Sequence, residues 1–197
     1  MKVFKDGSWS WKVTTIVTLL SLILFLGIIN PISSLIPMPE AIKDAIAELI
    51  HQTGIYSFLM VVILAPIFEE YIFRGVILRG LLKTISPIKA VLLSSFLFGI
   101  VHLNPWQFVT AFLIGIFSGW LYYKFKDLKL CILVHFCVNA IGFFSRFYLK
   151  DNLDVMELDY IDMLGGLQNY ILIIIISSSL CLLGIVCLNR TSNQPKN

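Results

Sequence analysis

Charged residues are scarce in this sequence of 197 residues, of which they make up 14%, whereas apolar residues make up 58% and the mean hydropathy is +0.88. This composition excludes a soluble globular protein and is typical of a membrane protein. We expect no separate soluble domain within the 197 residues. No internal repeat is visible, which weakens a secondary-transporter interpretation. No Cys-x-x-Cys spacing occurs either, so we interpret the four cysteines as small apolar packing residues: Cys131, Cys137, Cys181 and Cys187.

Six segments are long and apolar enough to cross a bilayer. They are residues 13–29, 55–82, 89–104, 106–125, 129–148 and 169–188. We therefore predict an all-α fold, a polytopic transmembrane helical bundle of about six spans. The prediction treats residues 1–197 as a single membrane-embedded domain, with an N-terminal stub at 1–12 and a polar tail at 190–197. Apolar residues at helical spacing also predict an amphipathic surface helix between the first two spans, within residues 31–52.

Lysine and arginine gather on one side of this predicted topology. That side holds Lys2, Lys5, Lys12, Arg79, Lys83, Lys89, Lys124, Lys126, Lys129, Arg190 and Lys196, and the other holds only Lys43, Arg146 and Lys150. The positive-inside rule therefore predicts a multi-pass integral membrane protein with both termini in the cytoplasm. Membrane lipid is an expected partner, and nucleic acid is not.

The feature that most needs explaining is the charge in the second span. Glu69, Glu70 and Arg74 lie near its middle, although one ionised residue at that depth costs about 2.5 to 3.5 kcal/mol on insertion scales. On a helix, Glu70 and Arg74 share a face, while Glu69 lies about 100° round from Glu70. We therefore expect Arg74 to neutralise Glu70 and to leave Glu69 free.

Two further polar pairs lie in apolar segments. Phe98 and His102 are four residues apart in one span, and His135 and Asn139 are four apart in another, so that each pair projects from one helix face. We predict that Glu69, His102, His135 and Asn139 turn toward one another. The glycines at 99, 115, 119 and 142 are interpreted as positions of close helix approach.

These residue types favour hydrolysis of a peptide bond. A buried carboxylate can take a proton from water, a neutral histidine can orient that water, and a histidine with an asparagine amide can stabilise an oxyanion. Two alternatives remain open, because glutamate and histidine inside a bundle also build proton relays and ion paths, or a buried structural polar network.

The order of the three motifs carries a resemblance. Glu69-Glu70-x-x-x-Arg74, Phe98-x-x-x-His102 and His135-x-x-x-Asn139 follow one another on successive apolar segments. In this arrangement the sequence resembles the CAAX-protease and bacteriocin-processing (Abi) family of intramembrane endopeptidases. Within that family it is similar to the type II CAAX prenyl endopeptidases.

The resemblance implies a role for each motif residue. Glu69 would activate the water, His102 would help to position it, and His135 and Asn139 would stabilise the oxyanion. The remaining three residues would support the site: Glu70, Arg74 and Phe98.

The same resemblance implies a type of organism and a class of substrate. Because the chain is short, it is similar to bacterial members, which are linked to bacteriocin maturation or self-immunity, and a bacterial plasma membrane is expected. The substrate would be a membrane-associated peptide or protein, and prenylation of it is not implied.

Metal use is a separate question. Two histidines and a glutamate can ligate zinc and leave a fourth position for water, and the set here would be Glu69, His102 and His135. The sequence has no His-Glu-x-x-His, and the resemblance favours a glutamate-and-water mechanism, so we expect no cofactor, with zinc as the alternative. A non-enzymatic bacteriocin-immunity or membrane scaffold protein is the competing class of function.

Depth poses a geometric condition for this site. With the termini inside, His135 lies about 9 to 12 Å from the cytoplasmic end of its helix, whereas His102 lies about 20 Å from Lys89. The two histidines can meet only if the third helix tilts or begins below the membrane surface.

Overall fold

The computed structural model describes residues 10–37, 39, 42, 44, 48, 51–152 and 159–192. Throughout these residues the chain is helical or irregular, with no strand. Five of its helices are long and apolar enough to cross a membrane, judged by length and composition: Trp11–Ser34, Ile55–Leu81, Pro105–Phe125, Leu128–Leu149 and Leu167–Thr191. The predicted all-α polytopic bundle is therefore confirmed.

The first two membrane helices change pitch along their length. In the first, α1 (Trp11–Leu24) continues through the π-helical η1 (Phe25–Ile29) into α2 (Asn30–Ser34). In the second, α4 (Ile55–Phe58) continues through the π-helical η2 (Leu59–Leu64) into α5 (Ala65–Glu70).

Each of these π turns ends two residues before a proline, Pro31 or Pro66. Proline lacks an N–H and its ring collides with the carbonyl four residues earlier, so a wider preceding turn relieves the conflict without ending the helix. The second helix then continues through the π-helical η3 (Tyr71–Leu78) and α6 (Arg79–Leu81).

The remaining helices begin and end at identifiable caps. α7 (Pro87–Ile100) is followed by a turn in which Leu103 has a φ of 58°. α8 (Pro105–Phe125) begins after Asn104, whose side chain accepts from the Gln107 N–H, and α9 (Leu128–Leu149) begins after Asp127 in the same way. The chain ends with α10 (Tyr160–Met163) and α11 (Leu167–Ser192).

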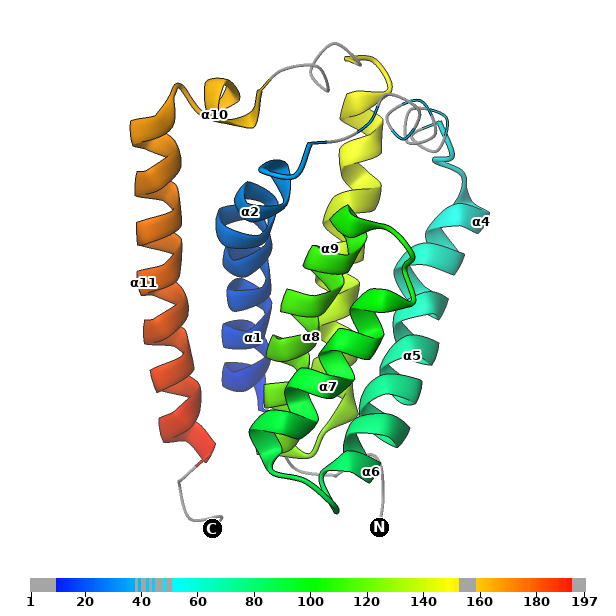
Figure 1. Ribbon diagram of the computed structural model, residues 1–197, viewed down its shortest axis with the longest axis vertical. Coiled ribbons are helices and arrows are strands. Elements are labelled where there is room, and N and C mark those ends of the chain that lie inside the picture. The colour runs from blue at the N-terminus through cyan, green and yellow to red at the C-terminus, as the bar shows by residue number, and fades with distance from the viewer. Residues whose placement is uncertain are drawn as a thin grey trace.

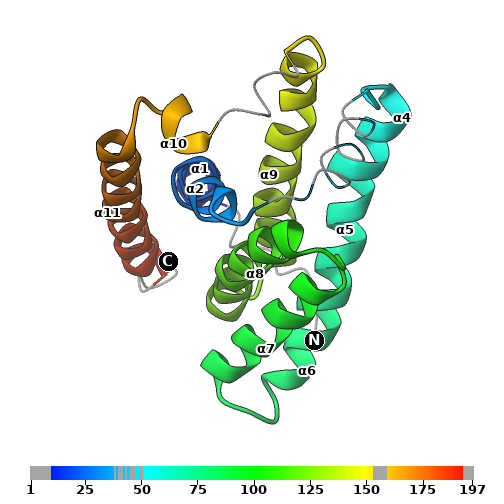
Figure 2. The same ribbon diagram turned by 45° about the horizontal axis from the view of Figure 1, so that its top comes forward.

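The α11 helix packs at the edge of the bundle, against the first membrane helix. The α1 helix contacts both α9 and α11, α9 contacts α8, and α7 packs along α8. Figures 1 and 2 both show α11 beside α1 and on the far side of the bundle from α4–α6. The largest core cluster joins α1, α8 and α9 and includes Val17, Leu121 and Val134, so the three helices form the centre of the bundle.

The third predicted span differs from the expectation. The α7 helix has 14 residues and ends at Ile100, which gives it about 21 Å, less than the hydrocarbon thickness of about 30 Å. Figure 1 shows α7 inclined against α5 and α9, and the turn that follows it stops short of the upper end of the bundle. A tilted third helix is one of the two arrangements expected to bring the histidines to one depth, and Phe98 on α7 contacts both imidazole rings.

The two ends of the described chain lie at the same end of the bundle, where α1 begins and α11 finishes (Figure 1). This arrangement agrees with an even number of crossings when α7 is counted. The predicted surface helix within residues 31–52 lies mostly outside the described residues, as do most of the stub and the tail.

Candidate active site

The two adjacent glutamates at the end of α5 have different surroundings. Glu70 is fully buried, and Arg74, one turn later and also fully buried, donates from Nη1 to Glu70 Oε1 at 2.9 Å. The side chain of Glu69 keeps 34% of its surface exposed. The expected pairing of Glu70 with Arg74 is therefore present, and Glu69 forms no ion pair with lysine or arginine among the described residues.

His135, on α9, lies between the two carboxylates. Its Nδ1 is 3.1 Å from Glu70 Oε1, and its Nε2 is 3.8 Å from Glu69 Oε2. Because the ionised Glu70 carboxylate can only accept, Nδ1 carries the proton of this bond. Nε2 is then an acceptor in the neutral ring and a donor in the imidazolium.

Phe98, on α7, holds the histidines and the arginine together. Its buried ring meets His102 and His135 edge to face, at centroid distances of 5.2 and 5.5 Å, and Arg74 Cζ lies 4.5 Å from its centroid. One aromatic side chain thus touches three of the predicted site residues. The sequence places Phe98 one helical turn before His102, but its contact with Arg74 arises from the packing of α7 against η3, and its contact with His135 from the reach of its ring to α9.

His102 lies just beyond the end of α7, in the turn that leads to α8. Its Nδ1 is 2.9 Å from the Phe98 carbonyl oxygen, which can only accept, so this nitrogen carries the proton and Nε2 is the acceptor of the neutral ring. Both site histidines are therefore anchored through Nδ1, and both leave Nε2 for other contacts.

Asn139 follows His135 by one turn of α9. Its Nδ2 donates to the Val61 carbonyl oxygen at 2.9 Å, a bond across to the π-helical η2. One amide hydrogen is committed to this bond, and the second remains for another acceptor.

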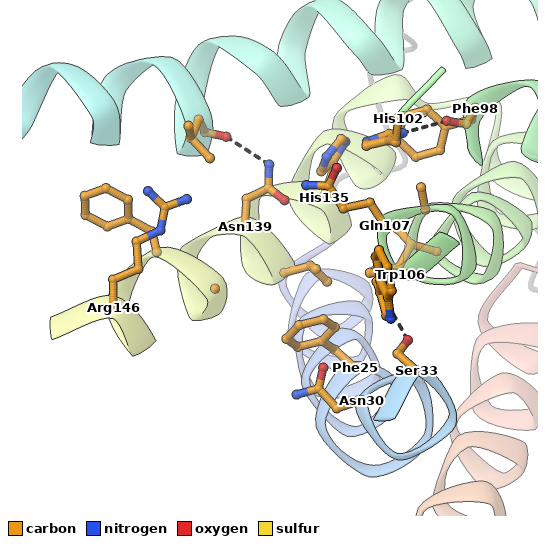
Figure 3. A pocket seen from close by; sticks show the side chains of 17 residues that line it. Phe25, Asn30, Ser33, Phe98, His102, Trp106, Gln107, His135, Asn139 and Arg146 are labelled. Atoms are coloured by element: carbon orange, nitrogen blue, oxygen red, sulfur yellow. Dashed lines mark hydrogen bonds between the residues drawn. The ribbon is translucent and has the colours of Figure 1, made fainter. Parts of the chain in front are cut away.

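A cavity of about 340 Å³ lies against these residues. Figure 3 shows His135, Asn139 and Arg146 following one another along α9, with Phe98 and His102 across from them. The other wall comes from the upper end of the first membrane helix and from the start of α8, and includes Asn30, Ser33, Trp106 and Gln107. The cavity therefore runs from the middle of the bundle toward the end opposite the described chain ends.

Glu69, Glu70 and Arg74 lie behind this cavity and not on its wall. The structure thus joins the first motif to the other two through His135 and Phe98, while Asn139 reaches the helix of the first motif only at Val61. Four buried polar atoms of the first motif have no hydrogen-bond partner in the described part of the chain: Oε2 of Glu69 and of Glu70, and Nε and Nη2 of Arg74.

Two glycines near the site have different roles. A Cβ at Gly115 would lie 3.0 Å from Arg74 Nη2 and 2.9 Å from Ser95 Cβ, so this glycine lets α8 approach the buried arginine. At Gly142 a Cβ would meet nothing within 4 Å, and this residue lines the cavity. The interpretation of Gly142 as a close-packing position is therefore wrong, and its α9 face borders open space.

Sequence reasoning missed Arg146, which lines the same cavity. By sequence, Arg146 is counted among the cations on the side away from the termini and not as a site residue, and α9 carries it within its last turn. The positions 135, 139, 142 and 146 share one helix face at a period of 3.6, and this spacing was the available signal.

The histidines and carboxylates of the site include possible metal ligands. Within the described residues, no three His, Cys, Asp or Glu side chains form a group with metal-ligand spacing. The set proposed for zinc, Glu69, His102 and His135, would have to draw together to hold an ion. The arrangement therefore leaves the metal alternative as a prediction.

Comparison with known families bears directly on this geometry. Residues 51–141 match the sequence model of a family described as type II CAAX prenyl endopeptidase Rce1-like. This segment of the chain is similar to that family. The match includes all three motifs, from Glu69 to Asn139, and ends before Arg146. No curated protein and no solved structure matches the chain.

The similarity of residues 51–141 suggests a peptidase of the CAAX-protease type. Together with five apolar helices of membrane-spanning length, it identifies this CAAX-protease relative as an integral membrane protein.

Proposed function

We propose that the chain is an intramembrane endopeptidase that hydrolyses a membrane-associated peptide with a water molecule activated by Glu69. The observation that supports this most is the pair formed by Glu69 and His135, of which His135 lines the cavity and Glu69 lies behind it. Glu69 Oε2 is buried, has no hydrogen-bond partner among the described residues, and lies 3.8 Å from His135 Nε2. That separation is too long for a direct hydrogen bond, so both atoms remain able to bind a water or a substrate atom.

In this proposal Glu69 takes a proton from water, and the hydroxide oxygen attacks the carbonyl carbon of the substrate. The neutral His102 accepts a hydrogen bond from the water through Nε2. The oxyanion receives bonds from the second amide hydrogen of Asn139 and from Nε2–H of protonated His135. Glu69 then returns the proton to the amide nitrogen as the C–N bond breaks, which yields an acid and an amine.

Glu70 positions His135 in the same proposal. Arg74 balances the charge of Glu70, and the bond from His135 Nδ1 to Glu70 Oε1 sets the orientation of the ring. Phe98 packs on both imidazoles and fixes their separation. The role of these three residues is therefore to orient the groups that meet the substrate.

A zinc-dependent version of the peptidase is favoured by one observation. Metal-ligating histidines usually donate their other ring N–H to a carboxylate or a carbonyl, and His135 and His102 both do so through Nδ1. In that version Glu69, His102 and His135 would hold the ion, which would supply an activated water.

We also propose that the cavity is reached from the side of the membrane opposite the cytoplasm, because it opens away from the end that carries the termini and most of the lysines and arginines. Such access suits an exported peptide, as in bacteriocin maturation or self-immunity.

The experiment is peptide cleavage by purified, detergent-solubilised protein, as wild type and as Glu69→Gln, with and without a strong chelator and with a metal assay. We expect cleavage that resists chelation and is lost in Glu69→Gln. Loss on chelation together with stoichiometric zinc would replace the glutamate mechanism by the zinc version. No cleavage by the wild type over a broad peptide panel would favour a non-enzymatic immunity or scaffold protein.

A further inference from the structure

One positively charged side chain, that of Arg146, lines the cavity without belonging to any of the three motifs. Arg146 is half-buried, and it is the lining residue with a permanent charge among the described residues. The rest of the lining is apolar or neutral polar apart from the two histidines. A permanent positive charge on the wall of such a cavity attracts an anionic group of a ligand.

Among the described residues, the contacts of Arg146 leave most of its donors available. Its Nη1 donates to the Gln52 carbonyl oxygen at 3.3 Å, and its Cζ lies 5.5 Å from the centroid of Phe143. No carboxylate in the described part of the chain forms an ion pair with it. One backbone carbonyl therefore holds the side chain, which has five N–H donors in a fork that fits a carboxylate.

Arg146 also shares its helix face with the proposed oxyanion-binding residues. It follows His135 by eleven positions and Asn139 by seven, and Figure 3 shows all three along one side of α9. Eleven residues of helix span about 16 Å, and an extended peptide covers this length in about four or five residues. A substrate held at His135 can therefore reach Arg146.

We propose that Arg146 binds a carboxylate of the substrate and so determines which peptides are cut and where. The chemistry is a carboxylate about four or five residues from the bond that is broken, either the chain end or an aspartate or glutamate side chain. This inference rests on the proposed peptidase function, and it adds a specificity residue outside the segment that matches the family.

The test uses binding to a form that does not cleave. Three fluorescent, N-acylated octapeptides of alanine and leucine serve as probes: one with a free terminal carboxylate, one with a terminal amide, and one amidated with aspartate at its last position. Each is titrated in detergent against Glu69→Gln alone and combined with Arg146→Gln or Arg146→Lys. Lys150→Gln in the same background is the matched control, because Lys150 is a nearby cation outside the cavity lining.

We expect an acidic probe to bind about tenfold to a hundredfold more tightly than the plain amide, the range of a charge-assisted hydrogen bond. Arg146→Gln should remove this preference, Arg146→Lys should keep part of it, and Lys150→Gln should keep all of it. Preference for both acidic probes identifies recognition of charge, and preference for the free acid alone identifies recognition of the chain end.

Equal binding of acidic and amidated probes, or a preference that survives Arg146→Gln, would overturn the inference. If Arg146→Gln is not monodisperse, the test uses Arg146→Lys instead. The ratio of its affinities for the acidic and the amidated probe should then fall below that of the Glu69→Gln background, and an unchanged ratio would overturn the inference. Cleavage by the wild type is scored separately. Cleavage by the wild type without a preference for acidic probes would contradict only this inference. A preference for acidic probes without cleavage would contradict only the proposed peptidase function.

Discussion

Replacing each of the two neighbouring glutamates by glutamine should affect stability very differently: Glu70→Gln should destabilise the protein, and Glu69→Gln should not. Glu70→Gln removes the charge that compensates Arg74, which is fully buried and 2.9 Å away. An unpaired buried charge of this kind costs about 3 to 5 kcal/mol. For a chain of this length that corresponds to a fall of about 6 to 20 °C in the thermal midpoint.

Glu69→Gln is the matched control for that loss. Glu69 is one-third exposed and has no lysine or arginine partner among the described residues, so its change should alter the free energy of unfolding by less than about 1 kcal/mol. It should nevertheless abolish cleavage, because the amide cannot take a proton from water.

The assay is thermal unfolding in detergent, followed by the fraction of monodisperse protein, together with peptide cleavage at a temperature where both variants are folded. The double variant Glu70→Gln/Arg74→Met should recover much of the stability, since no buried charge is left alone. It should remain impaired in cleavage, because His135 loses its carboxylate partner. A Glu70→Gln protein as stable as the wild type would refute the reasoning, and so would equal destabilisation by both single changes.

Three further predictions follow from the packing. Phe98→Ala should destabilise the protein by about 3 to 5 kcal/mol, measured by thermal unfolding, and should slow cleavage even at temperatures where the variant is folded. Phe98→Leu should lose less stability and less cleavage activity. Gly142→Ala should stabilise α9 by about 0.5 to 1 kcal/mol, whereas Gly142→Phe should fill the cavity and weaken peptide binding without lowering the midpoint; unweakened binding would place the substrate elsewhere. A cysteine at exposed Asp151 should react with an impermeant maleimide in intact cells, and one at exposed Lys83 only after permeabilisation; the reverse pattern would invert the topology.

Local pattern determined the membrane helices and much of their detail. The apolar runs predict every long helix, because a membrane-spanning segment must be apolar over its whole length. The i,i+4 spacing of Glu70 and Arg74 likewise predicts their pairing, because helix geometry alone brings these side chains together. The caps Asn104 and Asp127 follow from the same local rules.

Contacts between helices depend on rotation, depth and tilt, which no single segment encodes. The sequence predicted that Glu69, His102, His135 and Asn139 converge, but not that the nearest partner of His135 is Glu70, nor that Asn139 binds Val61. It also gave α7 a full membrane crossing, because an apolar run does not reveal where the turn before Pro105 begins.

By itself, then, the sequence determined a helical membrane protein with the three motifs of a CAAX-type peptidase, because apolar length and helical spacing are local properties. Only the tertiary structure decided that Phe98 joins Arg74 to both histidines, and that Arg146 faces the cavity from the last turn of α9. The physical reason is that these placements depend on how α7, α8 and α9 pack together, and close approaches such as that at Gly115 fix this packing across the bundle.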